Sequence, residues 1–315
     1  MKVLVTGGAG FIGSNLVEVL LENENVSFVR VLDNLATGHL ENIQEFMSHP
    51  KFEFLQGDIR NQEDCNKACA GIDVISHQAA LGSVPRSIAD PLKSHDVNVN
   101  GFLNMLEAAR ANDITRIVYA SSSSVYGDSE ISPKREDVVG KVLSPYAATK
   151  MSNELYAEAY SKSYNMTLIG LRYFNVFGKK QDPNGPYAAV IPLFVKAALN
   201  NESPTINGDG SITRDFTPVS NVTQINSSGL FSNKLELGKH YVFNVACGQM
   251  TDLSTLWNTI KEITKSTAEA TYGPNRKGDI FFSLADVSHA TEILSYSPDS
   301  NIKRALEGTV DFYIN

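Results

Sequence analysis

Residues 3–13 read Val3-Leu4-Val5-Thr6-Gly7-Gly8-Ala9-Gly10-Phe11-Ile12-Gly13. The apolar start of this segment predicts a short buried strand, and the residues from Ser14 to Glu22 predict a helix. The glycines allow a tight turn and a close approach of the backbone to a bound group, and the N-terminus of the helix favours a pyrophosphate. The segment therefore predicts a dinucleotide site that includes Gly7, Gly10, Phe11, Ile12 and Gly13.

A carboxylate follows the second expected strand and indicates which dinucleotide is bound. Asp33 and Asn34 come directly after the run from Phe28 to Leu32, roughly 20 residues beyond the glycines, at the spacing typical of such sites. An acidic residue there can accept hydrogen bonds from the adenosine ribose and repels a 2′-phosphate, so NAD is favoured over NADP. Asp58 and Ile59, after the expected strand Phe52 to Gln56, are predicted to reach the adenine.

The first half of the chain alternates short apolar runs with longer helical stretches. Further strands are expected at 74–76, 117–120 and 169–173, and a helix from Phe102 to Ala111. This alternation predicts the α/β class, with a Rossmann-type doubly wound parallel sheet. Residues 1–175, with returning segments near 216–250, are expected to form the NAD-binding domain. Residues 176–315 are less regular and rich in turn residues, and are expected to form mainly a smaller C-terminal substrate-binding lobe.

Composition excludes several other classes of protein. The 315 residues include 27 Lys and Arg against 35 Asp and Glu, a net charge of −8 that opposes binding to nucleic acid or to an anionic membrane. The chain has three cysteines, and Cys65 and Cys69 have no nearby histidines to complete a zinc site, so no metal is expected. No apolar run reaches the length of a membrane span, and a cytoplasmic location is expected.

A second motif carries candidate catalytic residues. In Ser144-Pro145-Tyr146-Ala147-Ala148-Thr149-Lys150, a serine suited to the N-cap and a proline suited to the first turn predict a helix start. Tyr146 and Lys150 then lie one turn apart on the same face. A free phenol is a poor base at neutral pH, but the ammonium and a positively charged nicotinamide both favour the phenolate. One of the serines before Val125 can supply a hydroxyl group that hydrogen-bonds the oxygen whose proton Tyr146 takes.

Together these elements resemble the extended short-chain dehydrogenase/reductase family nearly from end to end. Further landmarks are Gln78-Ala79-Ala80, Asn98-Val99-Asn100-Gly101, Arg172-Tyr173-Phe174-Asn175, Asn207-Gly208-Asp209-Gly210, Arg214-Asp215-Phe216-Thr217 and Arg276-Lys277-Gly278-Asp279. Where the family usually continues with Tyr-Val-Asp, this chain has Pro218-Val219-Ser220. The segments 78–87 and 181–192 look most like those of the UDP-N-acetylglucosamine 4-epimerases.

The resemblance implies roles for individual residues. It makes Ser122, Tyr146 and Lys150 the catalytic set. It adds Gln78, Ala79, Ala80, Asn98, Tyr146, Lys150 and Tyr173 to the residues that bind NAD. A UDP-sugar substrate is expected to contact Gly82, Ser83, Ser122, Ser123, Asn175, Ala189, Val190, Asn207, Arg214, Arg276, Asp279 and Ser283. Two of these are arginines, whose planar guanidinium groups can bind phosphate oxygens in pairs even in an acidic protein.

The expected reaction is the interconversion of UDP-GlcNAc and UDP-GalNAc through a 4-keto sugar. Alternatives are an epimerase acting mainly on UDP-Glc and UDP-Gal, one acting on UDP-uronic acids, and a non-catalytic NAD-binding regulator. Family members that perform 4,6-dehydration carry Asp-Glu where this chain has Ser123-Ser124. Members restricted to UDP-Glc and UDP-Gal place a tyrosine at the position of Ser283, where a serine leaves room for a 2-acetamido group. The resemblance also implies a homodimer formed through the helices that start near Phe102 and Pro145.

Overall fold

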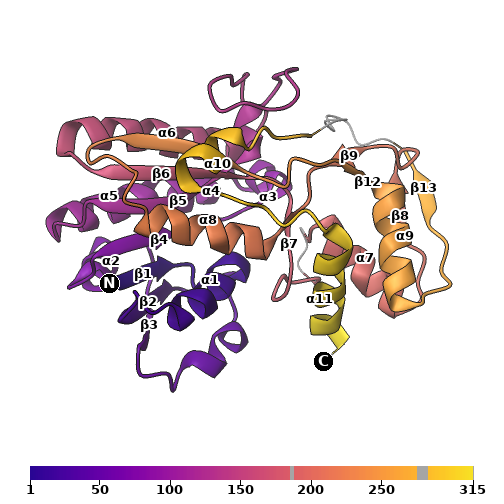
Figure 1. Ribbon diagram of the computed structural model, residues 1–315, viewed down its shortest axis with the longest axis horizontal. Coiled ribbons are helices and arrows are strands. Elements are labelled where there is room, and N and C mark those ends of the chain that lie inside the picture. The colour runs from indigo at the N-terminus through magenta and orange to yellow at the C-terminus, as the bar shows by residue number, and fades with distance from the viewer. Residues whose placement is uncertain (185–187, 275–282, 315) are drawn as a thin grey trace.

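The computed structural model describes residues 1–184, 188–274 and 283–314. Its centre is a parallel sheet of seven strands (Figure 1). From one edge to the other, their order is β11 (His240–Val245), β6 (Thr167–Tyr173), β5 (Arg116–Ser122), β4 (Val74–His77), β1 (Lys2–Thr6), β2 (Phe28–Asp33) and β3 (Phe52–Gln56). The strand order reverses direction next to β1, which creates the crevice in which such sheets bind ligands.

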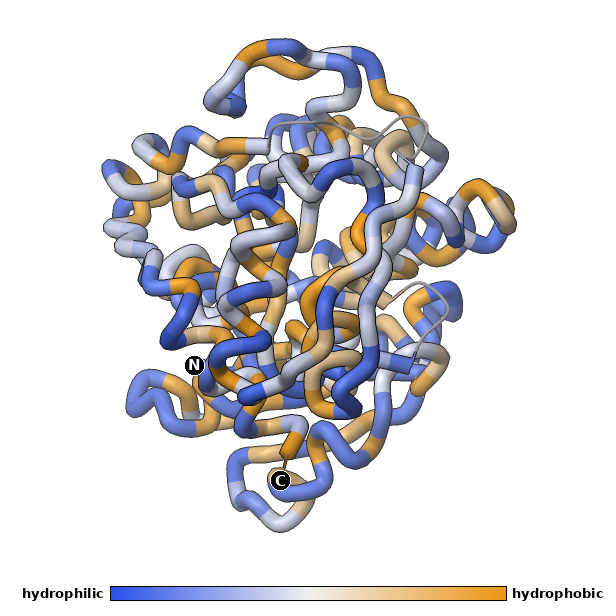
Figure 2. Tube along the Cα trace, turned by 90° about the vertical axis from the view of Figure 1, so that its right-hand side faces the viewer, coloured by the Kyte–Doolittle hydropathy of each residue, from blue (hydrophilic) through white to orange (hydrophobic). Residues whose placement is uncertain are grey.

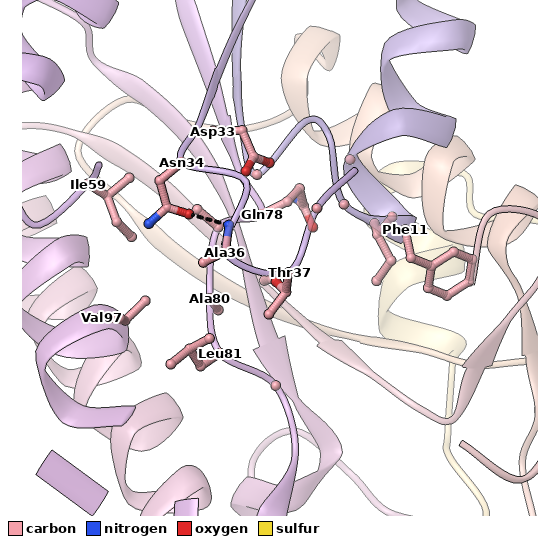
Figure 3. Close-up of a pocket in the computed structure, with 18 of the residues that line it drawn as sticks. Phe11, Asp33, Asn34, Ala36, Thr37, Ile59, Gln78, Ala80, Leu81 and Val97 are labelled. Atoms are coloured by element: carbon pink, nitrogen blue, oxygen red, sulfur yellow. Dashed lines mark hydrogen bonds between the residues drawn. The ribbon is translucent and has the colours of Figure 1, made fainter. Parts of the chain in front are cut away.

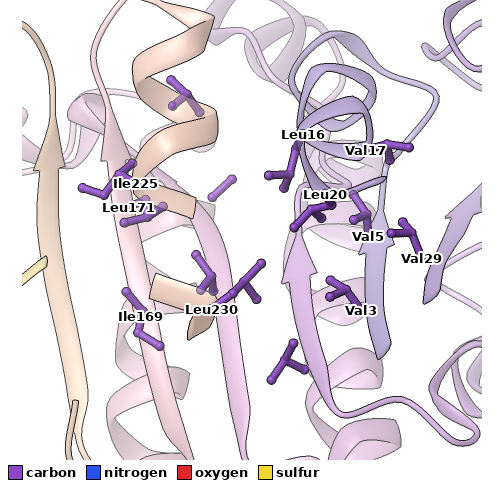
Figure 4. Packing of buried hydrophobic residues seen from close by; sticks show 14 of the residues in the cluster. Val3, Val5, Leu16, Val17, Leu20, Val29, Ile169, Leu171, Ile225 and Leu230 are labelled. Carbon is purple, nitrogen blue, oxygen red and sulfur yellow. The ribbon is translucent and has the colours of Figure 1, made fainter. Parts of the chain in front are cut away.

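Helices cover both faces of the sheet, and this explains why the strands are apolar along their whole length. On one face lie α1 (Phe11–Glu22), α8 (Val219–Phe231) and α10 (Ser288–Leu294), and Figure 4 shows the packing of this layer. The other face is covered by α2 (Gln62–Cys69), α5 (Gly101–Ala111) and α6 (Pro145–Tyr164). Neighbouring residues of a strand enter opposite layers: Val3 and Val5 pack under α1, whereas Leu4 belongs to the other cluster.

The first helix begins at Phe11, three residues earlier than its expected start. Gly10 occupies the N-cap position, so the glycine-rich turn is shorter than predicted and Gly13 already lies in the first helical turn. A Cβ atom on Gly13 would lie 2.1 Å from the carbonyl oxygen of Gly7. Only glycine lets this helix pack so closely on the turn.

The second half of the chain returns to the sheet. Strand β11 pairs with β6, and α8 and α10 pack on the same face as α1. Pro218 stands at the N-cap of α8, where its missing N–H interrupts no helical hydrogen bond, and Ser220 is exposed. The departure from the family pattern at 218–220 is therefore compatible with a regular helix start.

A smaller lobe lies beside the carboxyl ends of the strands (Figure 1). Helices α7 (Val190–Leu199), α9 (Leu253–Thr264) and α11 (Ile302–Ile314) form its core around Phe194 and Trp257. Its sheets are two-stranded. They pair β7 (Val176–Phe177) with β10 (Thr217–Pro218), β8 (Thr205–Asn207) with β13 (Thr271–Gly273), and β9 (Thr213–Arg214) with β12 (Thr251–Asp252).

Hydrophobic stretches of the chain are short and interrupted by hydrophilic ones (Figure 2). Among the described residues, no helix combines the length and the apolar character that crossing a bilayer requires.

Candidate active site

A cavity of ≈ 350 Å³ opens at the carboxyl ends of the central strands (Figure 3). Ile59 and Val97 lie at one end of the view and Phe11 at the other, with Asp33 between them. Of the predicted cofactor residues, those that line the cavity are Gly7, Gly10, Phe11, Ile12, Gly13, Asp33, Asn34, Ile59, Gln78, Ala79, Ala80, Tyr146, Lys150 and Tyr173. Ala120 and Ser121 of β5 line it as well, so residues from six separate strand ends converge on one space.

The glycine-rich turn forms a cradle that side chains would fill. Gly7 has a φ of +69°, and a Cβ atom on it would lie 2.7 Å from the backbone nitrogen of Ala79. Beside this turn, the first amides of α1 have no partners within the helix, and they give its N-terminus the partial positive charge that a pyrophosphate needs. The residues present thus fit a dinucleotide.

Asp33 lies buried in the wall of this cavity. Its carboxylate accepts hydrogen bonds from the backbone N–H groups of Ala9 (3.0 Å) and Leu35 (2.8 Å). Burial raises the pKa of the Asp33 carboxyl, while these two hydrogen bonds act in the opposite direction. The carboxylate therefore lies next to the glycine-rich turn, where it can accept hydrogen bonds from the hydroxyl groups of a ribose.

Two predicted cofactor residues, Asp58 and Asn98, are not among those lining the cavity. Asp58 binds Asn34 and the guanidinium group of Arg60, and the hydrogen bonds from Arg60 lower the pKa of Asp58 to about 2. Asn98 is buried, accepts from the N–H of Leu81 (2.7 Å), and donates to the Leu81 carbonyl and the Thr149 hydroxyl. In this structure both side chains hold residues of the wall in position.

The catalytic candidates meet where β5 ends and α6 begins. Ser144 caps α6 by accepting a hydrogen bond from the N–H of Ala147 (3.1 Å). The ammonium of Lys150 donates to the carbonyl of Ala120 (2.8 Å) and lies 6.0 Å from the centre of the Tyr146 ring. Ser122 is the last residue of β5, and its hydroxyl lies close enough to the Tyr146 phenol to lower the pKa of that phenol.

Burial shifts the pKa values of Tyr146 and Lys150. It raises the pKa of the Tyr146 phenol, and the nearby Ser122 hydroxyl counteracts part of the increase. Burial also lowers the pKa of Lys150 to about 8, because the ammonium has lost its water. A bound cation near Tyr146 would therefore be effective in stabilising the phenolate, since there is little solvent to screen it.

A buried polar network lies beside Tyr146. The Tyr173 hydroxyl donates to Gln78 Oε1 (2.9 Å) and accepts from Asn226 Nδ2 (2.9 Å). Gln78 Nε2 in turn donates to Ser76 and to Asn226 Oδ1. Asn226 comes from α8, and sequence reasoning missed it because no local motif marks it. The network fixes the orientation of two predicted cofactor residues.

Arg60 and Lys93 also line the cavity and were missed. Arg60 directly follows Ile59, so its place in the sequence was the available signal. Lys93 belongs to α4 (Pro91–His95), a short helix that the sequence analysis did not identify.

The predicted substrate residues are spread over several elements. Gly82 lines the cavity, and Ser83 caps α3 (Val84–Ala89). Ser123 begins η4 (Ser123–Tyr126), Ala189 and Val190 begin α7, Asn207 ends β8, and Arg214 belongs to β9. Arg276 and Asp279 lie outside the described residues.

Asp215 connects three of these substrate segments. Its carbonyl accepts a hydrogen bond from Asn175 Nδ2 (3.2 Å), and its carboxylate accepts from the N–H groups of Cys247 (2.9 Å) and Ala285 (3.3 Å). Arg214 precedes Asp215 and Ser283 lies two residues before Ala285. The structure therefore brings the segments of Asn175, Arg214 and Ser283 together.

Among the described residues, no group of three or more His, Cys, Asp or Glu side chains is arranged to hold a metal ion. Cys65 and Cys69 are buried in α2, and burial raises the pKa of each thiol to about 12.

Residues 3–246 match the NAD dependent epimerase/dehydratase family, and the chain belongs to it. It is an NAD-dependent epimerase, an isomerase, and NAD is its cofactor.

Particular relatives match over almost the whole chain. A putative UDP-glucose 4-epimerase of Methanocaldococcus jannaschii is 38% identical over 99% of this chain and 98% of its own. The structure of a UDP-N-acetylglucosamine 4-epimerase from Methanobrevibacter ruminantium, in complex with UDP-N-acetylmuramic acid, has a TM-score of 0.93 and 38% identity, covering 99% and 98% of the two chains. A dTDP-glucose 4,6-dehydratase from Streptomyces venezuelae has a TM-score of 0.89 and 28% identity, covering 100% and 97%.

Proposed function

We propose that the protein is a UDP-sugar 4-epimerase that interconverts UDP-GlcNAc and UDP-GalNAc, with activity on UDP-Glc and UDP-Gal as well. The observation that carries the proposal is that Tyr146 and Lys150 both line the NAD cavity, with Ser122 beside the Tyr146 phenol. The similar 4-epimerases support the reaction type, and the neighbour that is a UDP-N-acetylglucosamine 4-epimerase supports an acetylated substrate.

In this proposal, each member of the catalytic group has one task. Tyr146 removes the proton of the sugar 4-hydroxyl and later returns it, Lys150 favours the phenolate, and Ser122 holds the reacting oxygen. When bound, NAD would supply the acceptor for the hydride of C4 and the donor that returns it, and the sugar would have to present its opposite face between the two transfers. Arg214 would hold the diphosphate, so that the sugar ring can turn while the nucleotide stays bound.

The strand-end motif favours epimerisation over dehydration. The overall fold does not separate the two reactions, since a 4,6-dehydratase has a TM-score of 0.89 to this chain. Elimination of water needs a further acid and base, and family members that perform it carry Asp-Glu where this chain has Ser123 and Ser124. Hydroxyl groups at neutral pH cannot replace that pair.

Ser283 is proposed as the residue that admits the 2-acetamido group. It is half-buried and lies next to Leu284, whose carbonyl accepts a hydrogen bond from the N–H of Lys134 (2.8 Å). The hydrogen bond from the N–H of Ala285 to Asp215 holds Ala285 near Arg214. Ser283, two residues before Ala285, therefore lies close to the segment proposed to hold the diphosphate.

The test is to incubate the purified holoenzyme with UDP-GlcNAc, UDP-Glc or UDP-GlcA and to separate the epimers. We expect epimerisation of UDP-GlcNAc, and slower turnover of UDP-Glc. Ser283→Tyr should suppress the reaction of the acetylated pair and spare the other, whereas the control Ser283→Ala should retain both. Turnover of UDP-Glc alone by the parent enzyme would contradict the proposed substrate, and equal loss of both reactions in Ser283→Tyr would contradict the role of Ser283.

The homodimer is also proposed. Of the two helices expected at the interface, α6 carries the exposed Leu155, and α3 and α4, which pack on α6, carry the exposed Ile88 and Leu92. Light scattering during size-exclusion chromatography should give twice the mass of the chain, and Leu155→Glu should shift it to the monomer. A cytoplasmic location stays a prediction.

A further inference from the structure

Residues 34–46, here called the adenosine loop, form one wall of the NAD cavity. Asn34, Ala36 and Thr37 line the cavity from this loop (Figure 3). The middle of the loop is bound to the glycine-rich turn, because the N–H of His39 (3.0 Å) and the side-chain amide of Asn42 (2.8 Å) both donate to the carbonyl of Ala9. A dinucleotide held between this wall and the turn would be released more easily if the wall moved.

A lysine from the other half of the chain contacts the far end of the adenosine loop. Lys180 follows β7, and its ammonium donates to the carbonyl of Asn42 (2.9 Å) and to Glu45 Oε1 (3.0 Å). It also lies 4.9 Å from the centre of the Phe46 ring and 3.9 Å from Glu18 of α1. Three of these four groups belong to the adenosine loop.

The local structure of Lys180 is unusual for an ordinary surface lysine. Its side chain is only 7% exposed, whereas that of Lys179, which pairs with Glu18, is 39% exposed. Lys180 also has a φ of +67°, a left-handed conformation that non-glycine residues seldom adopt and that needs support from surrounding contacts. That support comes from the adenosine loop, 138 positions away in the sequence.

We propose that Lys180 is a positioning residue that keeps the adenosine loop closed over NAD and thereby slows release of the cofactor. An ammonium suits this role because it satisfies a carbonyl, a carboxylate and an aromatic face at once, and a buried charge makes each bond stronger than a neutral one. This role of Lys180 concerns the cofactor and is the same for any sugar substrate.

The experiment measures NAD release from the holoenzyme. Protein loaded with NAD is diluted, samples are passed through a desalting column at intervals, and the NAD that remains bound is quantified after acid extraction. Lys180→Met should release NAD roughly 10-fold faster or more, because hydrogen bonds to the charged group are lost. Lys180→Arg, which keeps the charge, should restore most of the retention.

Lys179→Met is the matched control, since it removes the adjacent cation without touching the adenosine loop, and its release rate should equal that of the parent. Hydrogen exchange of the free protein provides a second measurement, in which the amides of residues 35–46 should lose protection in Lys180→Met and keep it in Lys179→Met. Glu45→Gln, a change at an exposed side chain, should accelerate release to a smaller extent and serves if Lys180→Met does not fold. The proposal would be overturned if Lys180→Met and Glu45→Gln both released NAD at the rate of the parent. It would also be overturned if Lys179→Met accelerated NAD release as much as Lys180→Met does.

Discussion

The phenol of Tyr146 is the group on which the proton transfer depends. Replacing it in Tyr146→Phe removes one oxygen and leaves the ring, so the fold and the bound NAD should be retained. Turnover should fall about 10²–10⁴-fold, the usual effect of losing a general acid and base. Steady-state kinetics with a saturating UDP-sugar, together with the NAD content after acid extraction, would measure both.

Tyr156→Phe is a suitable control, because Tyr156 lies on the same helix and is 40% exposed. Its kinetics should match those of the parent. If Tyr146→Phe retained turnover within a few-fold of the parent, another group would have to carry the proton.

At the scale of elements, a buried ion pair holds the catalytic strand and helix together. Glu154, one turn beyond Lys150 on α6, binds Arg172 of β6 through two hydrogen bonds (2.9 and 2.8 Å) and accepts a third from Ser121 of β5 (2.6 Å). The two charged side chains are only 7% and 5% exposed. Three elements of the site therefore depend on one carboxylate.

Glu154→Ala should lower the free energy of unfolding by about 3–5 kcal/mol, because it leaves the Arg172 charge buried without its partner. The measurement is urea denaturation followed by circular dichroism. Glu262→Ala, which breaks an exposed pair with Lys303, should cost less than about 1 kcal/mol. Equal effects of the two substitutions would show that the buried pair contributes no more than a surface one.

At the scale of the whole molecule, buried histidines make stability depend on pH. Burial lowers the pKa of His77 to about 3, with the charge of Lys150 contributing, and burial also lowers the pKa of His240. The unfolded chain binds a proton on His77 below pH 6.5, whereas the folded protein does not. The stabilisation is therefore complete above pH 6.5 and is lost as the pH falls towards 3.

Buried carboxyl groups such as Asp215, whose pKa burial raises to about 6, act in the opposite direction, so the diagnostic quantity is the difference between variants. Between pH 6 and 5, the unfolding free energy of the parent should fall relative to that of His77→Gln by about 1.2 kcal/mol. Urea denaturation at each pH gives this difference. The exposed His95→Gln should show the slope of the parent, and a His77→Gln slope equal to the parent's would refute the assignment.

Features that depend on neighbours in the chain could be predicted from the sequence. The glycine-rich turn, the strands around it and the start of α6 are determined by local conformational preferences and by apolar periodicity. The spacing of Tyr146 and Lys150 places them on one helix face whatever surrounds the helix. For this reason the parallel sheet was predicted correctly and most of the predicted cofactor residues line one cavity.

Contacts between distant segments were decided only by the tertiary structure. Asn226 joins Gln78 across 148 positions, and Lys180 reaches Asn42 across 138. Neither residue carries a local signal, because an asparagine within a helix or a lysine within a polar loop is ordinarily a solvated side chain. Such residues acquire their roles when the returning half of the chain packs against the sheet, since burial and partners arise from packing and not from spacing along the sequence.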